Sequence, residues 1–205
     1  QQPSVRLFET GLRFIPDDSG LRQVPTLAMV STGPRFEESW ASPADDSDFF
    51  DLKGDIESLL GLTRRSEHFS FGATARPALH PGQTACITRK GEVVGVVGAL
   101  HPSVGTELGL NAPLYLCEID LAVLLEGEIL KYAELSKFPE VRRDLAVVVD
   151  KTVSSARLME DVRAAAGTYI TDLRLFDVYT GKGIDPKRKS LALGLTFRDQ
   201  SRTLG

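Results

Sequence analysis

Residues 138–204 decide the fold of the C-terminal third, and they read FPEVRRDLAVVVDKTVSSARLMEDVRAAAGTYITDLRLFDVYTGKGIDPKRKSLALGLTFRDQSRTL. Apolar runs flank one amphipathic segment, a pattern that predicts a strand at 144–150, a helix at 154–166 and strands at 170–180 and 188–198. This order is the first part of a ferredoxin-like unit, which normally continues with a second helix and a fourth strand. We therefore expect the chain to be a fragment of a longer protein.

The net charge of −4 hides an asymmetry between the two parts of the chain. Residues 137–205 hold 13 Lys and Arg against 9 Asp and Glu, a balance of +4, whereas residues 1–136 hold 11 against 19, a balance of −8. A polyanion would therefore prefer the C-terminal part. An excess of four charges is modest, so charge alone is weak evidence for a nucleic-acid partner.

The region before residue 126 predicts strands and two helices, and the stretch DLAVLLEG at 120–127 is also helix-like. An amphipathic helix is expected at 48–62, with Asp48 as its N-cap, and a short helix after Pro102. A polar loop, PDDSGLRQVP, is expected between the first two strands, and a domain boundary between residues 126 and 141. The expected strands are at 4–15, 26–32, 66–71, 83–90, 92–99 and 114–120.

Several residue groups suggest chemistry but have a simpler structural interpretation. His80 and His101 each precede a proline, and without a companion nucleophile they are expected to cap turns. Asp48, Asp51 and Asp55 could share a cation, but acids in a first helical turn usually interact with the helix dipole. The two cysteines, Cys86 and Cys117, lie in apolar runs and are expected to be buried thiols in a reducing compartment. No apolar run is long enough to span a membrane.

Basic and aromatic residues at the ends of the C-terminal strands are the candidate binding site. A small sheet with such residues at its margins is one solution for holding RNA. A solvated turn is the alternative for the lysine cluster, and Asp144 could pair with one neighbouring arginine. We expect Phe176 to pack inward and Tyr179 to stack on an RNA base. The candidate RNA-binding residues are Arg142, Arg143, Tyr179, Lys182, Lys187, Arg188, Lys189, Arg198 and Arg202.

The chain resembles a known family along its whole length, the beta subunits of bacterial phenylalanine–tRNA ligase. One such fragment would be a weak signal, but nine in the family's order are specific. They are RLFETGLRFIP, DFFDLKGDIESLL, ALHPGQTA, VGVVGALHP, LYLCEIDL, KFPEVRRDLAVVV, LFDVYTGKG, KSLALGLTF and DQSRTL.

The resemblance implies an α+β chain of two modules. Residues 1–130 resemble part of an antiparallel-sheet, class II synthetase-like module that is not catalytic, and 131–140 would be a linker. Residues 141–205 resemble a ferredoxin-fold anticodon-binding domain that lacks its last helix and strand.

The resemblance also implies function. The family's holoenzyme attaches phenylalanine to its tRNA, using ATP and magnesium, as a cytoplasmic alpha2-beta2 assembly. The fragment would then hold no cofactor, metal or catalytic residue of its own. Its partners would be the anticodon stem-loop of tRNA, the alpha subunit and a second beta subunit, with no DNA and no membrane. A different class of function stays open, in which the chain is a scaffold for subunit assembly and RNA contact is incidental.

Overall fold

A computed structural model describes residues 4–18, 20–37, 39–41, 45–129, 132, 136–199 and 201–202. Contacts within the chain divide it into two units, residues 1–130 and 131–205. Each unit has its own antiparallel sheet and its own helices, so each is described by itself.

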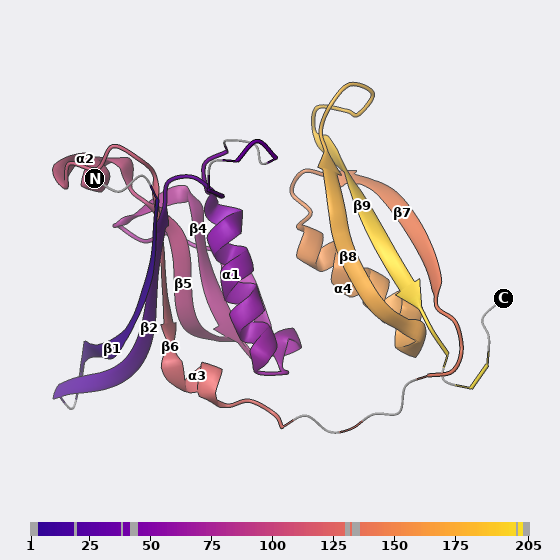
Figure 1. The fold of residues 1–205 in the computed structure, drawn as a ribbon, viewed down its shortest axis with the longest axis horizontal. Helices are drawn as coiled ribbons and strands as arrows, with labels where there is room; N and C mark the ends of the chain where they lie inside the picture. Colours follow the sequence, from indigo (N-terminus) through magenta and orange to yellow (C-terminus); the bar gives the residue numbers. More distant parts are fainter. Residues whose placement is uncertain are drawn as a thin grey trace. The chain divides into compact units, whose positions relative to one another are not determined.

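The first unit is built on a six-stranded antiparallel sheet in the order β1-β2-β6-β5-β4-β3. Helix α1 (Phe49–Leu62) packs on one face of this sheet (Figure 1). The shorter helices are η1 (Ser66–His68), α2 (Pro102–Glu107) and α3 (Leu121–Leu125). The strands are β1 (Val5–Asp17), β2 (Gly20–Thr32), β3 (Phe69–Ala73), β4 (Leu79–Arg89), β5 (Glu92–Leu100) and β6 (Leu114–Asp120).

The apolar stripe of α1 closes the core of the first unit. Leu52, Ile56 and Leu60 recur every four residues, and all three are buried against the sheet. Glycine lets β5 and β6 approach closely beneath the helix. A Cβ at Gly95 would lie 2.6 Å from the carbonyl oxygen of Glu118, so no larger residue fits there without moving the backbone.

The start of α1 is fixed by a capping box. Asp48 accepts hydrogen bonds from the N–H groups of Phe50 and Asp51, at 2.7 and 3.0 Å, and the Asp51 carboxylate accepts from the Asp48 N–H at 2.7 Å. Arg35 lies 2.9 Å from Asp51 and 3.4 Å from Asp48. Partial burial opposes ionisation of Asp51. The Asp48 N–H and the Arg35 guanidinium stabilise its carboxylate by more than this, so the pKa of Asp51 is lowered. The acids at the start of this helix therefore serve as cap and ion-pair partners.

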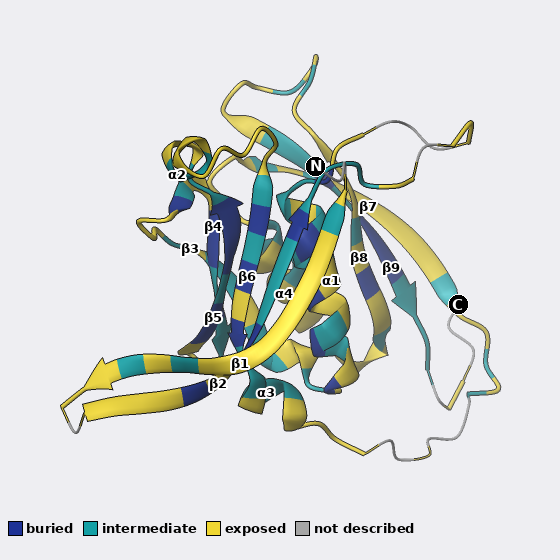
Figure 2. Cartoon of the chain, turned by 60° about the vertical axis from the view of Figure 1, so that its left-hand side comes forward, coloured by how far each residue is buried: buried dark blue, intermediate teal, exposed yellow. Residues whose placement is uncertain are grey.

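The polar segment between the first two strands is a hairpin, so the loop expected there is wrong. Pairing of β1 with β2 continues to Asp17 opposite Gly20, and Gly20 takes a φ of 130° that suits glycine. Most of the far part of this ribbon is exposed (Figure 2), with only Arg13 and Ile15 of β1 partly buried. Because it buries no face against a core, polar residues and prolines are tolerated in it, and the sequence shows no apolar alternation there.

The second unit is a three-stranded antiparallel sheet in the order β7-β9-β8 with one helix on it. The helix lies on one face of the sheet (Figure 1), and its Leu158, Met159 and Val162 pack on the core that holds Leu173 and Leu193. The strand order and the single packed helix agree with a ferredoxin-like β-α-β-β arrangement. Its elements are β7 (Val141–Asp150), α4 (Ser155–Ala166), η2 (Gly167–Tyr169), β8 (Ile170–Tyr179) and β9 (Arg188–Phe197).

The central strand β9 divides its side chains between the two faces of this sheet. Leu193 and Leu195 point to α4 and are buried, while Ala192 and Gly194 point to the opposite face, which we call the open face. Directly opposed residues of antiparallel strands share a face. The open face therefore also carries alternate residues of β7 and β8.

Both histidine expectations are confirmed. His80 Nδ1 accepts the N–H of Gly82 at 3.1 Å, and His101 Nδ1 accepts the N–H of Ser103 at the start of α2. His68, which falls in the strand expected at 66–71, instead ends the short helix η1 and is half-buried.

Both cysteines are free thiols; Cys117 is buried as expected, whereas Cys86 is only partly buried. Burial raises the pKa of Cys117 to about 12, with the nearby Glu118 adding to the effect, so this thiol stays protonated at neutral pH. Among the described residues, no helix has the length and apolarity that a membrane crossing requires.

We expect Asp48→Ala to lower the free energy of unfolding by about 1 kcal/mol, because it leaves two helix N–H groups without an acceptor. Asp55→Ala, an exposed acid on the same helix outside the cap, is the control and should change stability by about 0.5 kcal/mol or less. Urea unfolding measures both. Equal losses would contradict the capping role.

Asp51 should make stability pH-dependent. Its pKa is lower in the folded than in the unfolded chain, so its contribution is fully present above about pH 4. That contribution is lost as the pH falls through the folded pKa. Asp51→Asn should therefore flatten the acid limb of the stability curve, and an unchanged limb would show that Asp51 is not responsible.

Candidate nucleic-acid interface

Basic residues gather at the end of the second unit where the β8–β9 hairpin turns. Lys182, Lys187 and Arg188 are exposed there, and Lys189 follows half-buried in β9. Among the described residues, Lys182 and Lys187 form no ion pair, and Arg188 lies 3.9 Å from Asp150. We call this group, together with Lys151, the hairpin cluster. Its charges are available to an external anion.

Hydrogen bonds hold the backbone of the hairpin in one shape. Asp185 accepts the Arg188 N–H on its carbonyl at 2.8 Å and the Lys187 N–H on its carboxylate at 2.8 Å. The Ile184 N–H donates to the carbonyl of Gly181 at 3.2 Å. The loop therefore carries its lysines on a backbone fixed by its own bonds.

Lys151 belongs to this cluster and was missed in the sequence. It lies in the turn after β7, and its N–H donates to the carbonyl of Lys187 at 2.9 Å. The two turns are 36 residues apart along the chain, so only the pairing of β7 with β9 shows that they meet. A ferredoxin-like strand order gave the signal that could have placed it, because β7 and β9 are neighbours in that order.

Tyr179 lies at the end of β8, opposite Ser190 of β9 and beside the hairpin cluster. Its side chain is half exposed, and its hydroxyl donates to the carbonyl of Lys182 at 3.1 Å. The hydroxyl is therefore engaged within the protein, and the aromatic ring is the part that an RNA base could meet.

Phe176 does not pack inward, so that expectation is wrong. Phe176 follows the alternation of the inward Leu173 and Leu175 onto the open face, where it is 52% exposed. The register shift between Leu175 and Asp177 is a β-bulge that puts Asp177 and Tyr179 on the same face. A Cβ added at Gly194 would meet Arg174 at 3.3 Å and Phe176 at 3.6 Å. An arginine and an aromatic ring therefore lie together over Gly194.

Arg142 and Arg143 lie near the other end of the sheet, at the start of β7. Arg142 is exposed on the open face and lies 3.8 Å from Glu140, not beside Asp144 as the sequence suggested. Arg143 donates to the carbonyl of Arg142 at 2.8 Å. Both side chains are exposed; Glu140 partly offsets the charge of Arg142, whereas Arg143, bonded to a neutral carbonyl, keeps its charge.

Arg198 and Arg202 are at that same end and are paired with acids. Arg198 forms an ion pair with Glu140, and Arg202 lies 3.2 Å from Asp199. The backbone N–H and hydroxyl of Ser201, and then Arg202, lower the pKa of Asp199 by stabilising its carboxylate. These two arginines therefore stabilise the segment that follows β9.

The nine sequence candidates do not form one cluster. Strand β9 has ten residues between the hairpin and Arg198, which separates the two groups by about 30 Å. The structure brings Tyr179, Lys182, Lys187, Arg188 and Lys189 together and leaves the four arginines of the other end apart. Of the two groups, the hairpin cluster has the arrangement that suits phosphate and base contact.

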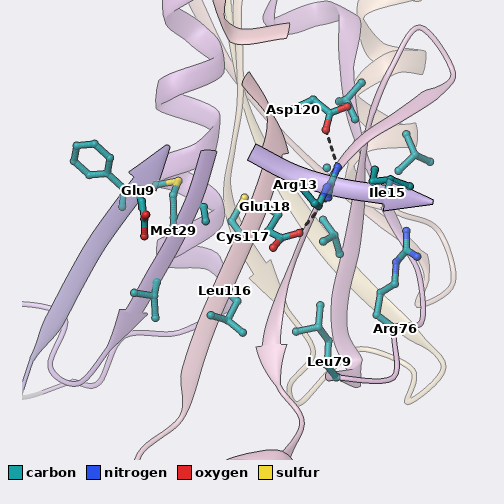
Figure 3. A pocket seen from close by; sticks show the side chains of 18 of the residues that line it. Glu9, Arg13, Ile15, Met29, Arg76, Leu79, Leu116, Cys117, Glu118 and Asp120 are labelled. Atoms are coloured by element: carbon teal, nitrogen blue, oxygen red, sulfur yellow. Dashed lines mark hydrogen bonds and ion pairs between the residues drawn. The ribbon is translucent and has the colours of Figure 1, made fainter. Parts of the chain in front are cut away.

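The first unit holds a cavity of about 1080 Å³ on the sheet face opposite α1. Figure 3 shows Arg13 extending across it to Glu118 and Asp120, at 3.1 and 2.8 Å. This arginine is neutralised by its partners, so it offers little to an anionic substrate. Among the described residues, no group of three His, Cys, Asp or Glu side chains could hold a metal ion.

Comparison with known proteins matches both units. Residues 1–121 match the family described as "Phenylalanyl tRNA synthetase beta chain CLM domain", and residues 136–205 match "Ferredoxin-fold anticodon binding domain". Similar proteins named phenylalanine–tRNA ligase beta subunit occur in Pseudomonas putida, Shewanella oneidensis and Mannheimia succiniciproducens, at 53%, 48% and 46% identity. Each alignment covers 100% of this chain and 26% of the relative, so the chain spans about a quarter of their length.

The position of Phe176 on the open face makes a testable distinction between two apolar residues of β8. Leu173→Ala should cost about 2–5 kcal/mol because Leu173 is 4% exposed in the core. Phe176→Ala, on the open face, should cost about 1 kcal/mol or less despite the larger side chain. Chemical unfolding of the two variants gives the comparison. A larger loss for Phe176→Ala would show that the ring packs inward.

Proposed function

Because the chain belongs to the phenylalanine–tRNA ligase beta subunit family, we propose that its second unit binds the anticodon stem-loop of tRNA. The observation that carries this proposal is the hairpin cluster beside Tyr179, in the unit matched by the anticodon-binding family. Binding at the anticodon would orient the distant acceptor end of the tRNA toward an active site in another chain. The task of this unit is therefore positional.

Two physical contributions would hold the RNA. Lysines and arginines of the hairpin cluster neutralise phosphates, which supplies affinity that depends on salt. Aromatic rings on or beside the open face stack on unpaired bases, at about 1–3 kcal/mol for each base. Phe176 and Tyr179 are the exposed aromatic residues of β8 that could do so.

The first unit is proposed to be a non-catalytic, class II synthetase-like module. Its six-stranded antiparallel sheet with a helix on one face is compatible with that fold, and the charge of Arg13 in its cavity is neutralised. In this proposal the alpha subunit performs aminoacylation with ATP and magnesium, in a cytoplasmic assembly of two alpha and two beta chains.

A scaffold role is the second candidate, and one observation favours it for the first unit. The β1–β2 hairpin exposes large apolar side chains, among them Leu7, Phe8 and Leu12, at 65%, 77% and 53%. Exposed apolar surface of this kind is typical of protein–protein contact sites. The two roles are compatible, because each concerns a different unit.

Charge reversal in the hairpin cluster should weaken tRNA binding. In the ligase assembled from alpha subunits and full-length beta subunits, Lys182→Glu with Lys187→Glu should lower tRNA affinity at least about tenfold at low salt. The slope of log affinity against log salt should also fall by about 1.4, the value for two phosphate contacts on a single strand. Filter binding over a salt series measures both quantities.

The matched control reverses the same amount of charge on the covered side of the sheet. Arg157→Glu with Arg163→Glu changes two exposed arginines of α4, which packs against the face opposite the open one. This variant should keep tRNA affinity within about twofold. Equal losses in both variants would indicate a general charge effect and would contradict the proposed site.

The scaffold role predicts a defect in assembly. Leu7→Ser with Phe8→Ser and Leu12→Ser should reduce the recovery of the complex with alpha subunits, measured by size-exclusion chromatography. The stability of the variant beta subunit should change little, because the three side chains are exposed. Unchanged assembly would remove this hairpin from the proposed contact.

A further inference from the structure

Tyr179 folds back over the chain that follows it. Its hydroxyl reaches the carbonyl of Lys182, and its ring passes beside the backbone of Gly181. A Cβ at Gly181 would lie 2.7 Å from Cε2 of the ring and closer still to Cζ and the hydroxyl oxygen. Real side chains do not approach so closely, so glycine at 181 and the observed ring position depend on each other.

The backbone of Gly181 does not itself require glycine. Positive φ angles occur at Gly20, Gly167 and Gly183, among others, but not at Gly181. An alanine could therefore take the same backbone conformation without strain. The three atoms nearest to such a Cβ all belong to Tyr179, and they lie at the far end of a side chain that can rotate away. Alanine at 181 should leave the fold intact and displace the ring.

The position of the Tyr179 ring matters for RNA binding because the ring lies beside the hairpin cluster. Tyr179 opposes Ser190 at the hairpin end of the sheet, next to the lysines that carry free charge. With its hydroxyl engaged by Lys182, the residue presents a ring in a fixed orientation. A base stacks well only on a ring already held in place, since ordering a mobile side chain costs free energy on binding.

We propose that Gly181 is a positioning residue for RNA recognition, which holds the ring of Tyr179 in its stacking orientation by leaving room for it. This inference rests on the proposed function of the second unit. Gly181 touches no RNA in this account, and its effect is exerted through Tyr179. The hydrogen bond to Lys182 is the second restraint, and the hairpin bonds around Asp185 keep that carbonyl in place.

A double-mutant cycle in the assembled ligase tests the proposal. Tyr179→Ala should lower tRNA affinity about 5- to 150-fold, the range for loss of one stacked base. Gly181→Ala should lower it by a similar factor, and the double variant should bind no more weakly than Tyr179→Ala alone. Gly105→Ala is the matched control, because a Cβ there has nothing within 4 Å, and it should bind as the unchanged protein does.

A second readout reports the stacking directly. The probe is a tRNA with 2-aminopurine in the anticodon loop, whose fluorescence is quenched on stacking. Gly181→Ala should remove as much of the protein-dependent quenching as Tyr179→Ala does. Tyr179→Phe keeps the ring but loses the bond to Lys182, so it should fall between the unchanged protein and Tyr179→Ala. This variant tests the restraint even if Gly181→Ala does not fold.

The outcomes separate the inference from the proposed function. If Tyr179→Ala weakens binding while Gly181→Ala stays within twofold of the unchanged protein, the positioning role is wrong and the RNA site stands. Additive losses in the double variant would also overturn the positioning role, because Gly181 would then act independently of the ring. If Tyr179→Ala itself changes neither affinity nor quenching, the proposed stacking by this residue fails, and the inference fails with it.

Discussion

The second unit depends on one packing constraint, which is that a single helix can cover only one face of a three-stranded sheet. Helix α4 buries Leu173, Leu193 and Leu195 on its side, and these contacts form the unit's core. The other face is left to small and polar side chains of β9, with Gly194 and Ala192 at its centre. That division creates the open face, because the residues that stabilise the fold and those available to a ligand belong to opposite sides of the same strands.

The sequence predicted the elements well because their apolar patterns are strong. The core helix of each unit was placed to within one residue at its start. Asp48 was the expected cap of the first helix, and the structure shows that Ser154 caps the second. The hairpin of β1 and β2 was missed because it buries neither face at its far end. Phe176 was misplaced because the β-bulge between it and Tyr179 puts both residues on the open face, which no periodicity in the sequence reveals.

The candidate site could be predicted in composition but not in grouping. Basic residues were recognised at both ends of the strands, yet their separation by the length of β9 depends on strand pairing. Acid partners also decide which cations are available. In the sequence, Arg198 and Arg202 look as available as Lys182 and Lys187. In the structure, however, Arg198 is paired with Glu140 and Arg202 with Asp199. Lys151 joins the cluster through a turn that lies far from the hairpin along the chain.

The open face carries acids as well as bases, and this limits how RNA could lie on it. Asp144 and Asp177 share the face with Arg142 and Arg174, so a phosphate backbone laid along the whole sheet would meet carboxylates. Phosphates are therefore best accommodated at the hairpin cluster, where Lys182 and Lys187 form no ion pair with described residues. The sheet itself suits bases, because rings can stack on aromatic side chains and amino groups can donate to carboxylates. Binding phosphates at the hairpin cluster and bases on the sheet favours a bent loop with splayed bases over a regular duplex, since only a loop presents its backbone and its bases to separate surfaces.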